Sequence, residues 1–299
     1  MIRTFDEMVA DVKKSPTKVV AVAYAHDPDV LEALQTAQRE DIARGVLVGP
    51  KAQIEKAAAS VNVSLAPFEI VDVADEKEAT RAAVNLVREG QADVLMKGLC
   101  STSTILGAVL DKQTGLRESK LLSHVAAFQV PAYHKLIIVS DVAMNIAPTL
   151  EDKVAITENA VAVAHRLGIE TPKVAIIAAV EKVNPESMPC TADAAILTQM
   201  GARGQIKKAI IDGPLAVDNA FSKKACEIKG IVTPVGGDAD IAITPDIEAG
   251  NVFYKVMGYL AMAKTAGIIV GARKPIVLTS RADSDETKFL SIVFAMKVC

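Results

Sequence analysis

Two stretches of the sequence bring side chains that bind anions to the end of an apolar run. In the first, KPIVLTSRADSDETKF (residues 274–289), the apolar run ends in Ser280 and Arg281, and Asp283 follows shortly after. An arginine binds phosphate through two parallel N–H donors, and a serine hydroxyl adds another donor. Ligands of open α/β sheets bind where strands end, so this stretch is consistent with a phosphate site. Asp283 and Glu286 equally fit a capping box, which would only begin a helix.

The second stretch is VLMKGLCSTSTILGAVLDK (residues 94–112). Its apolar run ends in Lys97, and four hydroxyl side chains follow, beginning with Ser101 and Thr102. The apolar spacing after them predicts a helix, whose amino end presents unpaired backbone N–H groups and partial positive charge. Together with the charge of Lys97, these groups form a candidate anion site. The alternative is that one hydroxyl caps the helix and the others are only small and polar.

Two further strand ends carry polar groups in the middle of the chain. The stretch IIDGPLAVDNAF (residues 210–221) predicts a strand that stops in a turn at DGP. The stretch DIAITPDIEAGNVFYKVMGYLA (residues 240–261) predicts a strand that stops before Asp246, with Asn251 just ahead of a helix. Asp and Gly at such places usually form turns. Several turns of this kind would also line a single crevice, so Asp246 and Asn251 are candidate binding residues.

The overall composition argues against several classes of protein. The chain has 33 basic and 36 acidic side chains, a formal net charge of −3 and 4% aromatic residues. Nucleic-acid binding needs basic patches and aromatic stacking faces, so it is not expected. Hydrophobic residues reach 51%, but no apolar run approaches the ~18 residues that cross a bilayer. The amino terminus lacks a signal-peptide pattern, and we expect a soluble, cytoplasmic protein that does not bind membranes.

Motifs for other chemistries are absent from the sequence. It contains neither of the common nucleotide-phosphate loops, GxGxxG and GxxxxGK[ST], and neither GxSxG nor HExxH. Its four cysteines form no CxxC pair and have no close histidine, so neither a zinc site nor a disulfide framework is expected. The four histidines are scattered, and a lone histidine is more often structural. None of them receives a catalytic role.

Short apolar runs alternate with helical patterns along the whole chain, which predicts a layered α/β architecture. Most runs are continuously apolar, as expected for strands of a mostly parallel sheet with helices on both faces. The longest predicted helix, 150–167, follows Thr149, has Asp152 in capping-box position and stops at Gly168. The predicted strands cover residues 19–24, 45–48, 68–73, 94–96, 136–139, 174–180, 208–211, 241–243, 268–270 and 276–278.

The same alternation suggests two domains. Length alone favours about two, and the best hinge is DVAMNIAP, residues 141–148. We expect a first domain of residues 1–141 plus about 280–299, which makes it discontinuous, and a second domain of residues 142–279. Each would be a three-layer α/β/α domain, with a cleft between them.

Several stretches of this sequence resemble motifs of one protein family. The phosphate acetyltransferase and phosphate butyryltransferase family has, in the same order and spacing, stretches similar to DGPLAVDNA, TPDIEAGNVFYKVM and KPIVLTSRADSDE. The butyryltransferase branch, the branched-chain phosphotransacylases, is the more similar one to MKGLCSTST, GLRESKLLSHVAAF and SDVAMNIAPTLEDKVAI. The resemblance covers residues 90–299 well and the N-terminal third loosely.

The resemblance implies both a fold and an activity. The fold is a pair of α/β domains with an interdomain active-site cleft, as in isocitrate and isopropylmalate dehydrogenases, usually in a homodimer or higher homo-oligomer. The activity is reversible acyl transfer, in which acyl-CoA and phosphate give acyl phosphate and CoA, here with butyryl or branched short-chain acyl groups. Coenzyme A and phosphate are substrates, and the resemblance implies neither a metal nor a cofactor.

Residue roles follow from the same resemblance. Ser280 and Arg281 match the Ser-Arg pair of the family, so Arg281 would hold phosphate and Ser280 would stabilise the CoA thiolate. The acetyl branch has its proposed base seven residues after that serine, where this chain has Thr287, which cannot act as a base near neutral pH. Asp283, Asp285 or Glu286 would have to substitute, and we name Asp283 as the catalytic candidate.

A second departure concerns an arginine of the acetyl branch, which falls on Gly107 here. Arg117 is the candidate that would supply this charge. The expected binding residues are therefore Lys97, Ser101, Thr102, Arg117, Asp246 and Asn251.

Two other functions are compatible with such a chain. A decarboxylating NAD-dependent dehydrogenase of similar fold would need clustered aspartates that bind a divalent metal, and the sequence shows no such cluster. A non-catalytic sensor of acyl phosphate or CoA would explain the missing base at Thr287.

Overall fold

The computed structural model describes residues 1–280 and 282–299, so Arg281 lies outside the described residues. The chain forms two compact units. One comprises Met1–Phe5 and Leu121–Thr265, and the other comprises Asp6–Lys120 and Ala266–Cys299. The divisions of the sequence-based domains, after 141 and near 280, fall at other positions than these. The chain passes from one unit to the other at three places.

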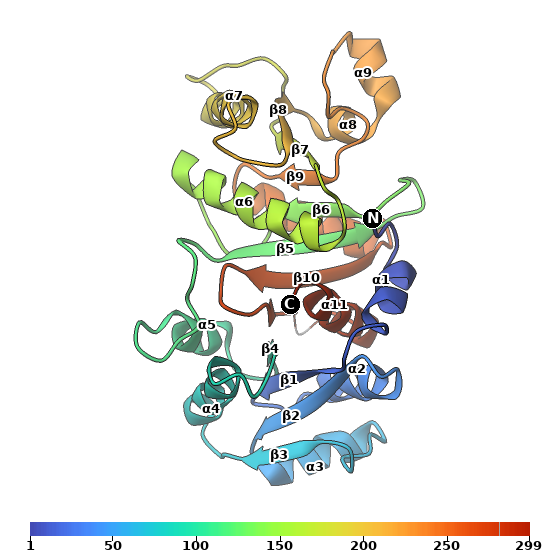
Figure 1. Ribbon diagram of the computed structural model, residues 1–299, viewed down its shortest axis with the longest axis vertical. Coiled ribbons are helices and arrows are strands. Elements are labelled where there is room, and N and C mark those ends of the chain that lie inside the picture. The colour runs from blue at the N-terminus through green and yellow to red at the C-terminus, as the bar shows by residue number, and fades with distance from the viewer. Residues whose placement is uncertain (281) are drawn as a thin grey trace. The chain divides into compact units, whose positions relative to one another are not determined.

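The unit built from Asp6–Lys120 and Ala266–Cys299 contains a mostly parallel sheet (Figure 1). Its strands follow the order β3, β2, β1, β4, β11 and β10, and all neighbours are parallel except β11 and β10. The strands are buried apolar runs such as KVVAVA in β1, which suits a sheet covered on both faces. Their bounds are β1 Lys18–Ala23, β2 Ala43–Gly49, β3 Glu69–Asp72, β4 Val94–Lys97, β10 Lys264–Val270 and β11 Ile276–Val277.

Helices of this unit belong to two groups. Helix α2 packs against α3 and α11, while α4 packs against α5. Because β1–α2–β2 and β2–α3–β3 cross in one direction and β3–α4–β4 crosses back, right-handed crossovers place the two groups on opposite faces of the sheet. The helices are α1 Phe5–Val12, α2 Pro28–Arg39, α3 Lys51–Ser60, α4 Glu76–Arg88, α5 Thr102–Leu110 and α11 Asp285–Val298.

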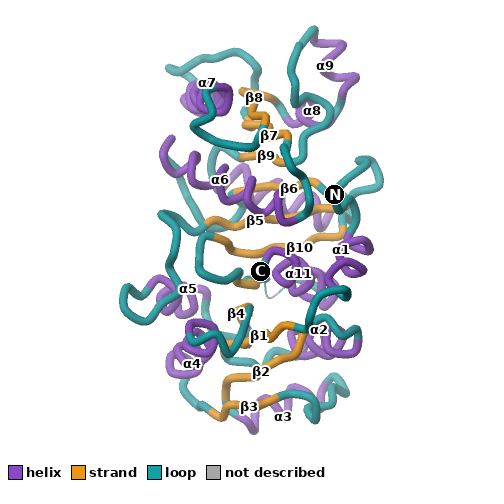
Figure 2. Tube along the Cα trace, viewed as in Figure 1, coloured by secondary structure: helices purple, strands orange, loops and turns teal. Residues whose placement is uncertain are grey.

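The other unit has a sheet in the order β5, β6, β9, β7 and β8, in which only β5 and β6 are antiparallel. Its core gathers Phe128, Val139, Ala175 and Leu215 from these strands. Figure 2 shows the same alternation of helices and strands along the trace. The elements are β5 Ser123–Gln129, β6 Ile137–Ser140, α6 Leu150–Arg166, β7 Lys173–Ile177, α7 Pro189–Ala202, β8 Ile210–Leu215, α8 Val217–Phe221, α9 Lys223–Lys229, β9 Ile241–Ile243, α10 Ile247–Lys255 and a π-helical turn, η1, Val256–Leu260.

The structure confirms the α/β class, the mostly parallel sheet and the long helix α6 with its capping box at Thr149 and Asp152. It corrects three local expectations. The run SHVAAFQ forms β5, which the sequence patterns missed because it begins with two polar residues. The DGP stretch continues inside β8 and forms no terminating turn. Asn251 lies inside α10, which already begins after Asp246.

None of the helices in the described part of the chain is long and apolar enough to cross a membrane.

Candidate active site

Three neighbouring parallel strands end at the same edge of one sheet. Strand β4 pairs in parallel with β1 on one side and with β11 on the other. The segments that follow these strands therefore meet at what we call the carboxyl edge, formed by residues 24–27, 97–104, 279–280 and 282–283. This is the edge where open α/β sheets bind ligands. The structure thus brings together four of the sequence-predicted residues, which are Lys97, Ser101, Ser280 and Asp283.

The segment after β4 is a loop of hydroxyl groups that begins α5. Ser101 is the N-cap, and its Oγ accepts a hydrogen bond from the Thr104 N–H at 3.0 Å. The same oxygen lies 2.8 Å from the hydroxyls of Ser103 and Thr104. Both expectations for this stretch are compatible with that geometry, because one serine caps the helix while Thr102 stays exposed beside it. We call residues 98–104 the hydroxyl loop.

Backbone contacts hold the hydroxyl loop close to the end of β1. The N–H groups of Gly98 and Leu99 donate to the carbonyls of Ala23 and Tyr24, each at 2.9 Å. A Cβ on Gly98 would lie 2.3 Å from the Tyr24 oxygen, so only glycine allows this approach. Lys97 is buried and its Nζ donates to the Gly98 carbonyl at 3.0 Å, which ties its charge to the loop.

The segment after β11 is a tight turn from Ser280 to Asp283. The Asp283 Oδ2 accepts a hydrogen bond from the Ser280 N–H at 2.8 Å, and the Asp283 N–H donates to the Ser280 carbonyl at 3.1 Å. The Ala282 N–H approaches the Ser280 Oγ at 3.4 Å. Asp283 is buried whereas Ser280 is exposed, so the carboxylate supports the turn from beneath and the hydroxyl faces outward.

Helix α11 begins one residue later than the capping-box expectation. Its N-cap is Ser284, whose Oγ accepts from the Thr287 N–H at 3.2 Å. The pairing of Asp283 with Glu286 as a capping box is therefore wrong, because Asp283 uses its carboxylate on the preceding turn. Thr287, at the position where the acetyl branch has its base, has its Oγ1 3.2 Å from the same Ser284 hydroxyl. The prediction for Arg281 concerns a residue outside the described part of the chain.

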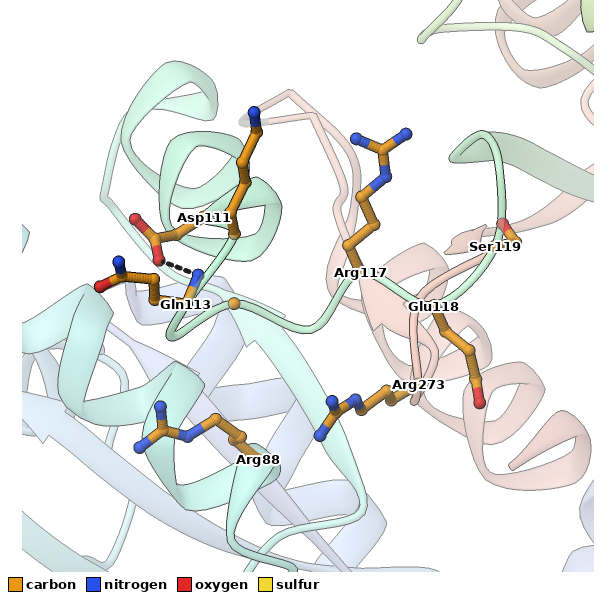
Figure 3. Close-up of a pocket in the computed structure, with 9 residues that line it drawn as sticks. Arg88, Asp111, Gln113, Arg117, Glu118, Ser119 and Arg273 are labelled. Atoms are coloured by element: carbon orange, nitrogen blue, oxygen red, sulfur yellow. Dashed lines mark hydrogen bonds between the residues drawn. The ribbon is translucent and has the colours of Figure 1, made fainter.

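Arg117 lies in a different place, in the loop that follows α5. This loop pairs with the turn between β10 and β11, since the Arg273 N–H donates to the Leu116 carbonyl at 2.8 Å. Arg117 lines a pocket of about 420 Å³ together with Arg88, Lys112 and Arg273. Figure 3 shows Arg117 extending away from Arg88 and Arg273. We call this set of side chains the basic pocket.

A second hollow lies along the groove between α4 and α5. It has a volume of about 270 Å³ and is lined by the cations Lys77 and Arg81 of α4 and by Ser103 and Gly107 of α5. Asp111 lines both this groove and the basic pocket. Backbone N–H groups of Thr114 and Gln113 hold the pKa of Asp111 below its usual range, so its charge is already bound by its own turn. The groove therefore connects the hydroxyl loop with the basic pocket.

Asp246 and Asn251 lie in the other unit, where both are used structurally. The Asp246 Oδ1 accepts from the Ala249 N–H at 2.8 Å and caps α10, and the Asn251 amide donates to the Val142 carbonyl at 3.3 Å. Thr244 adds a hydrogen bond of 2.8 Å to the Asp141 carbonyl. These contacts fix the start of α10 against the loop after β6.

One titratable group of the carboxyl edge received no role from the sequence. His26 follows β1, and its buried Nδ1 has no hydrogen-bond partner among the described residues. Burial lowers the pKa of His26, and the charge of Asp27 opposes this in part. The pattern that would have pointed to it is its place just after an apolar strand, next to the helix cap Asp27. Within the described residues, no group of three or more His, Cys, Asp or Glu side chains is arranged to hold a metal ion.

Comparison with known proteins defines the class to which this chain belongs. The family model described as Phosphate acetyl/butaryl transferase matches residues 4–82 and 76–296, which is nearly the whole chain. The chain belongs to this family.

Its relatives carry the names phosphate butyryltransferase and phosphate acetyltransferase. The phosphate butyryltransferase of Clostridium beijerinckii is 49% identical over 298 residues, covering 100% of this chain and 98% of that protein. The phosphate butyryltransferase of Clostridium acetobutylicum is 48% identical, covering 100% and 99%. A crystal structure of a branched-chain phosphotransacylase from Enterococcus faecalis V583 superposes with a TM-score of 0.84 at 36% identity, covering 94% of this chain and 99% of that one.

Proposed function

We propose that this protein is a phosphate acyltransferase that converts acyl-CoA and phosphate into acyl phosphate and CoA, with butyryl or branched short-chain acyl groups. One observation carries the proposal. In a chain that belongs to this family, the hydroxyl loop and the Ser280 turn follow neighbouring parallel strands and meet at one sheet edge. The dehydrogenase and sensor alternatives find no support among the relatives.

The reaction demands positioning and charge stabilisation more than covalent catalysis by the protein. Phosphate is itself the nucleophile, and with a second pKa of about 6–7 it is largely dianionic at neutral pH. Its attack on the thioester carbonyl creates an oxyanion, and each well-aimed donor there lowers the barrier by about 3 kcal/mol. Thiolate is the group that leaves, and its negative charge also needs donors.

We assign these tasks to the carboxyl edge. Arg281 is proposed to hold the phosphate with its two-pronged guanidinium, and the outward hydroxyl of Ser280 to stabilise the thiolate. Lys97, Ser101 and Thr102 are proposed to supply positive charge and donors from the hydroxyl loop. The exposure of Ser280 and Thr102 supports these roles, because both hydroxyls are accessible to a ligand.

We propose that Asp283 supports the Ser280 turn and does not act as a base. Its Oδ2 already accepts the Ser280 N–H at 2.8 Å, and its side chain is buried. A carboxylate committed in this way keeps the Ser280 turn in shape. The group that takes the proton of the CoA thiol in the reverse reaction is left unassigned.

The groove between α4 and α5 supports a path for the rest of CoA. It leads from Ser103 of the hydroxyl loop past Lys77 and Arg81 to the basic pocket, where Arg117 lies. The phosphate groups of CoA lie far from its thiol, and α5, with nine residues, is about 13 Å long. We propose that Arg117 binds a phosphate group of the nucleotide end, since it is too far from Ser280 along this path to bind the reacting phosphate.

The other unit is proposed to contribute substrate contacts near Asp246 and Asn251, and to form the interface of a homodimer. The segment of α10, η1 and the residues just after them exposes several apolar side chains, which favours contact with a second copy. These are Val252, Val256, Tyr259, Leu260 and Met262. Mass measurement in solution tests this part, and a monomer at micromolar concentration would contradict it.

A panel of acyl-CoA substrates from two to six carbons tests the proposed activity. We expect release of CoA thiol, followed with a thiol reagent, only when phosphate is added, and the highest rates with four-carbon and branched chains. One methylene contributes only about 1–3 kcal/mol of discrimination, so neighbouring lengths should react more slowly but measurably. The rate should be unaffected by EDTA or NAD. Binding of butyryl-CoA without turnover would favour the sensor instead.

A further inference from the structure

A buried lysine lies directly behind the Ser280 turn. Lys288 is in the first turns of α11, and its side chain is only 1% exposed. Its Nζ donates to the carbonyl oxygen of Asp283 at 2.6 Å. An ammonium group is expensive to bury, and it stays in such a place only when acceptors surround it. The nature of its acceptors therefore indicates what the charge is for.

The second acceptor comes from α2, far away in the sequence. The Asp29 Oδ2 lies 3.0 Å from the Lys288 Nζ. Asp29 is itself held in place, because its N–H donates to the N-cap side chain of Asp27 at 3.1 Å. Lys288 therefore links the turn after β11 to the start of the helix that follows β1. Both segments belong to the carboxyl edge.

Lys288 acts on Asp283, which is the residue that binds Ser280. Asp283 binds the Ser280 N–H through its carboxylate and the Ser280 carbonyl through its own N–H. Lys288 holds the carbonyl of the same residue. Lys288 therefore fixes the backbone of Asp283 at its carbonyl, while the carboxylate and the N–H of Asp283 hold the backbone of Ser280.

We propose that Lys288 is a positioning residue for acyl transfer, which acts through Asp283 to fix the Ser280 turn. The proposal rests on the proposed function, because it assumes that Ser280 meets the reacting thioester. Misplacement of a reacting group by about 1 Å costs about a hundredfold in rate. Loss of the link should therefore lower kcat, while the affinity for acyl-CoA, which depends on the groove and the hydroxyl loop, stays the same.

The first experiment replaces Lys288 with methionine. Methionine is similar in length to the apolar stem of lysine and removes the ammonium charge. We expect Lys288→Met to lower kcat at least about tenfold with the KM for butyryl-CoA within about threefold of wild type. The matched control is Lys135→Met in the other unit, since Lys135 is also a buried lysine, 5% exposed, bound to Asp238 and Asp240. It should lower the melting temperature similarly and leave kcat unchanged.

The second experiment removes the other end of the link. Asp29→Ala removes the carboxylate that Lys288 contacts, and the Asp29 side chain is 47% exposed, so the protein should fold. We expect kcat to fall about threefold to tenfold, and the double variant with Lys288→Met to lose little more than Lys288→Met alone, because both changes break one link.

The outcomes separate this proposal from the proposed function. An unaltered kcat in Lys288→Met, with stability reduced as in Lys135→Met, would make Lys288 a structural residue only. If Lys288→Met does not fold, Asp29→Ala decides, and an unaltered kcat in that variant overturns the proposal. Failure of the wild-type protein to transfer butyryl groups to phosphate refutes the proposed function, whatever the variants do.

Discussion

The two segments that follow β4 and β11 at the carboxyl edge differ in the side chains that stabilise them. After β4, the side chains of the hydroxyl loop bind one another, with Ser101 at the centre of hydrogen bonds of 2.8–3.0 Å to Ser103 and Thr104, while Lys97 and Glu76 bind the backbone of the loop. After β11, the turn is stabilised by buried charge, with Asp283 beneath Ser280 and Lys288 behind Asp283. The first network lies at the surface, and the second lies inside the protein.

This difference suggests a division of labour. Neutral hydroxyls at a surface exchange partners at little cost, since water or a ligand replaces each hydrogen bond. Buried ionic contacts lose much more when one partner moves, because the remaining charge has no solvent. The hydroxyl loop is thus suited to adapt to a ligand, and the Ser280 turn is suited to keep one geometry. A loop that adapts contributes to binding, whereas a fixed turn contributes to the rate.

The largest effect that this comparison predicts is at the turn. Arg281→Ala should raise the phosphate KM and lower kcat/KM about a hundredfold, or about 2.7 kcal/mol, because a phosphate loses a two-pronged partner. Steady-state kinetics with varied phosphate measures this. Arg44→Ala, an exposed arginine on β2 of the same unit, is the control and should behave as wild type. Near-wild-type kinetics in Arg281→Ala would remove that residue from the site.

The second largest predicted effect concerns Ser280 in the same turn, and it separates a change in kcat from a change in phosphate binding. Ser280→Ala should lower kcat about tenfold to a hundredfold and change the phosphate KM little, because the hydroxyl acts on the thiolate as it forms. Rates measured at saturating butyryl-CoA with varied phosphate test this. A raised phosphate KM with unaltered kcat would contradict the thiolate role and would transfer Ser280 to the phosphate subsite.

Much of this arrangement was predictable from local patterns. Continuous apolar runs indicated the strands of the parallel sheet, and the hydroxyls after Lys97 indicated a helix start, which Ser101 caps. Ligands of open α/β sheets bind where strands end, which is why Ser280 and Ser101 were candidate site residues. These features depend on residues close together in the sequence, which is why the sequence reveals them.

The parts that were missed depend on contacts between distant residues. The contact of Lys288 with Asp29 joins positions 259 residues apart, and no spacing rule links them. Asp283 was expected to cap a helix or act as a base, because an acid before a helix usually does so. Only the fold shows that its carboxylate is buried under Ser280. Arg117 was expected to supply the charge of an arginine of the acetyl branch, and its neighbours in the basic pocket, such as Arg88, come from distant segments.

A smaller effect tests how closely the hydroxyl loop is fitted to β1. Gly98→Ala should lower stability by about 1–3 kcal/mol, because the new Cβ would meet the Tyr24 carbonyl oxygen at 2.3 Å. Urea unfolding measures the change. Gly107→Ala is the matched control on α5, where no atom lies within 4 Å of an added Cβ. It should raise stability by about 0.5–1 kcal/mol, as for any glycine inside a helix. Equal loss in both variants would contradict the close approach.

The smallest predicted effect tests whether the hydroxyl loop binds a substrate in addition to beginning α5. Ser101→Ala removes the N-cap of α5 and should lower stability by about 1 kcal/mol, measured by urea unfolding. Ser101→Gly should lower it by only a few tenths of a kcal/mol, since glycine is tolerated at this position. If the loop also binds CoA or phosphate, both variants should raise the KM of that substrate equally despite their different stability. A KM that follows stability, high in the alanine variant and normal in the glycine variant, would limit Ser101 to capping, and ligand binding at this junction would then depend on Lys97 and Thr102.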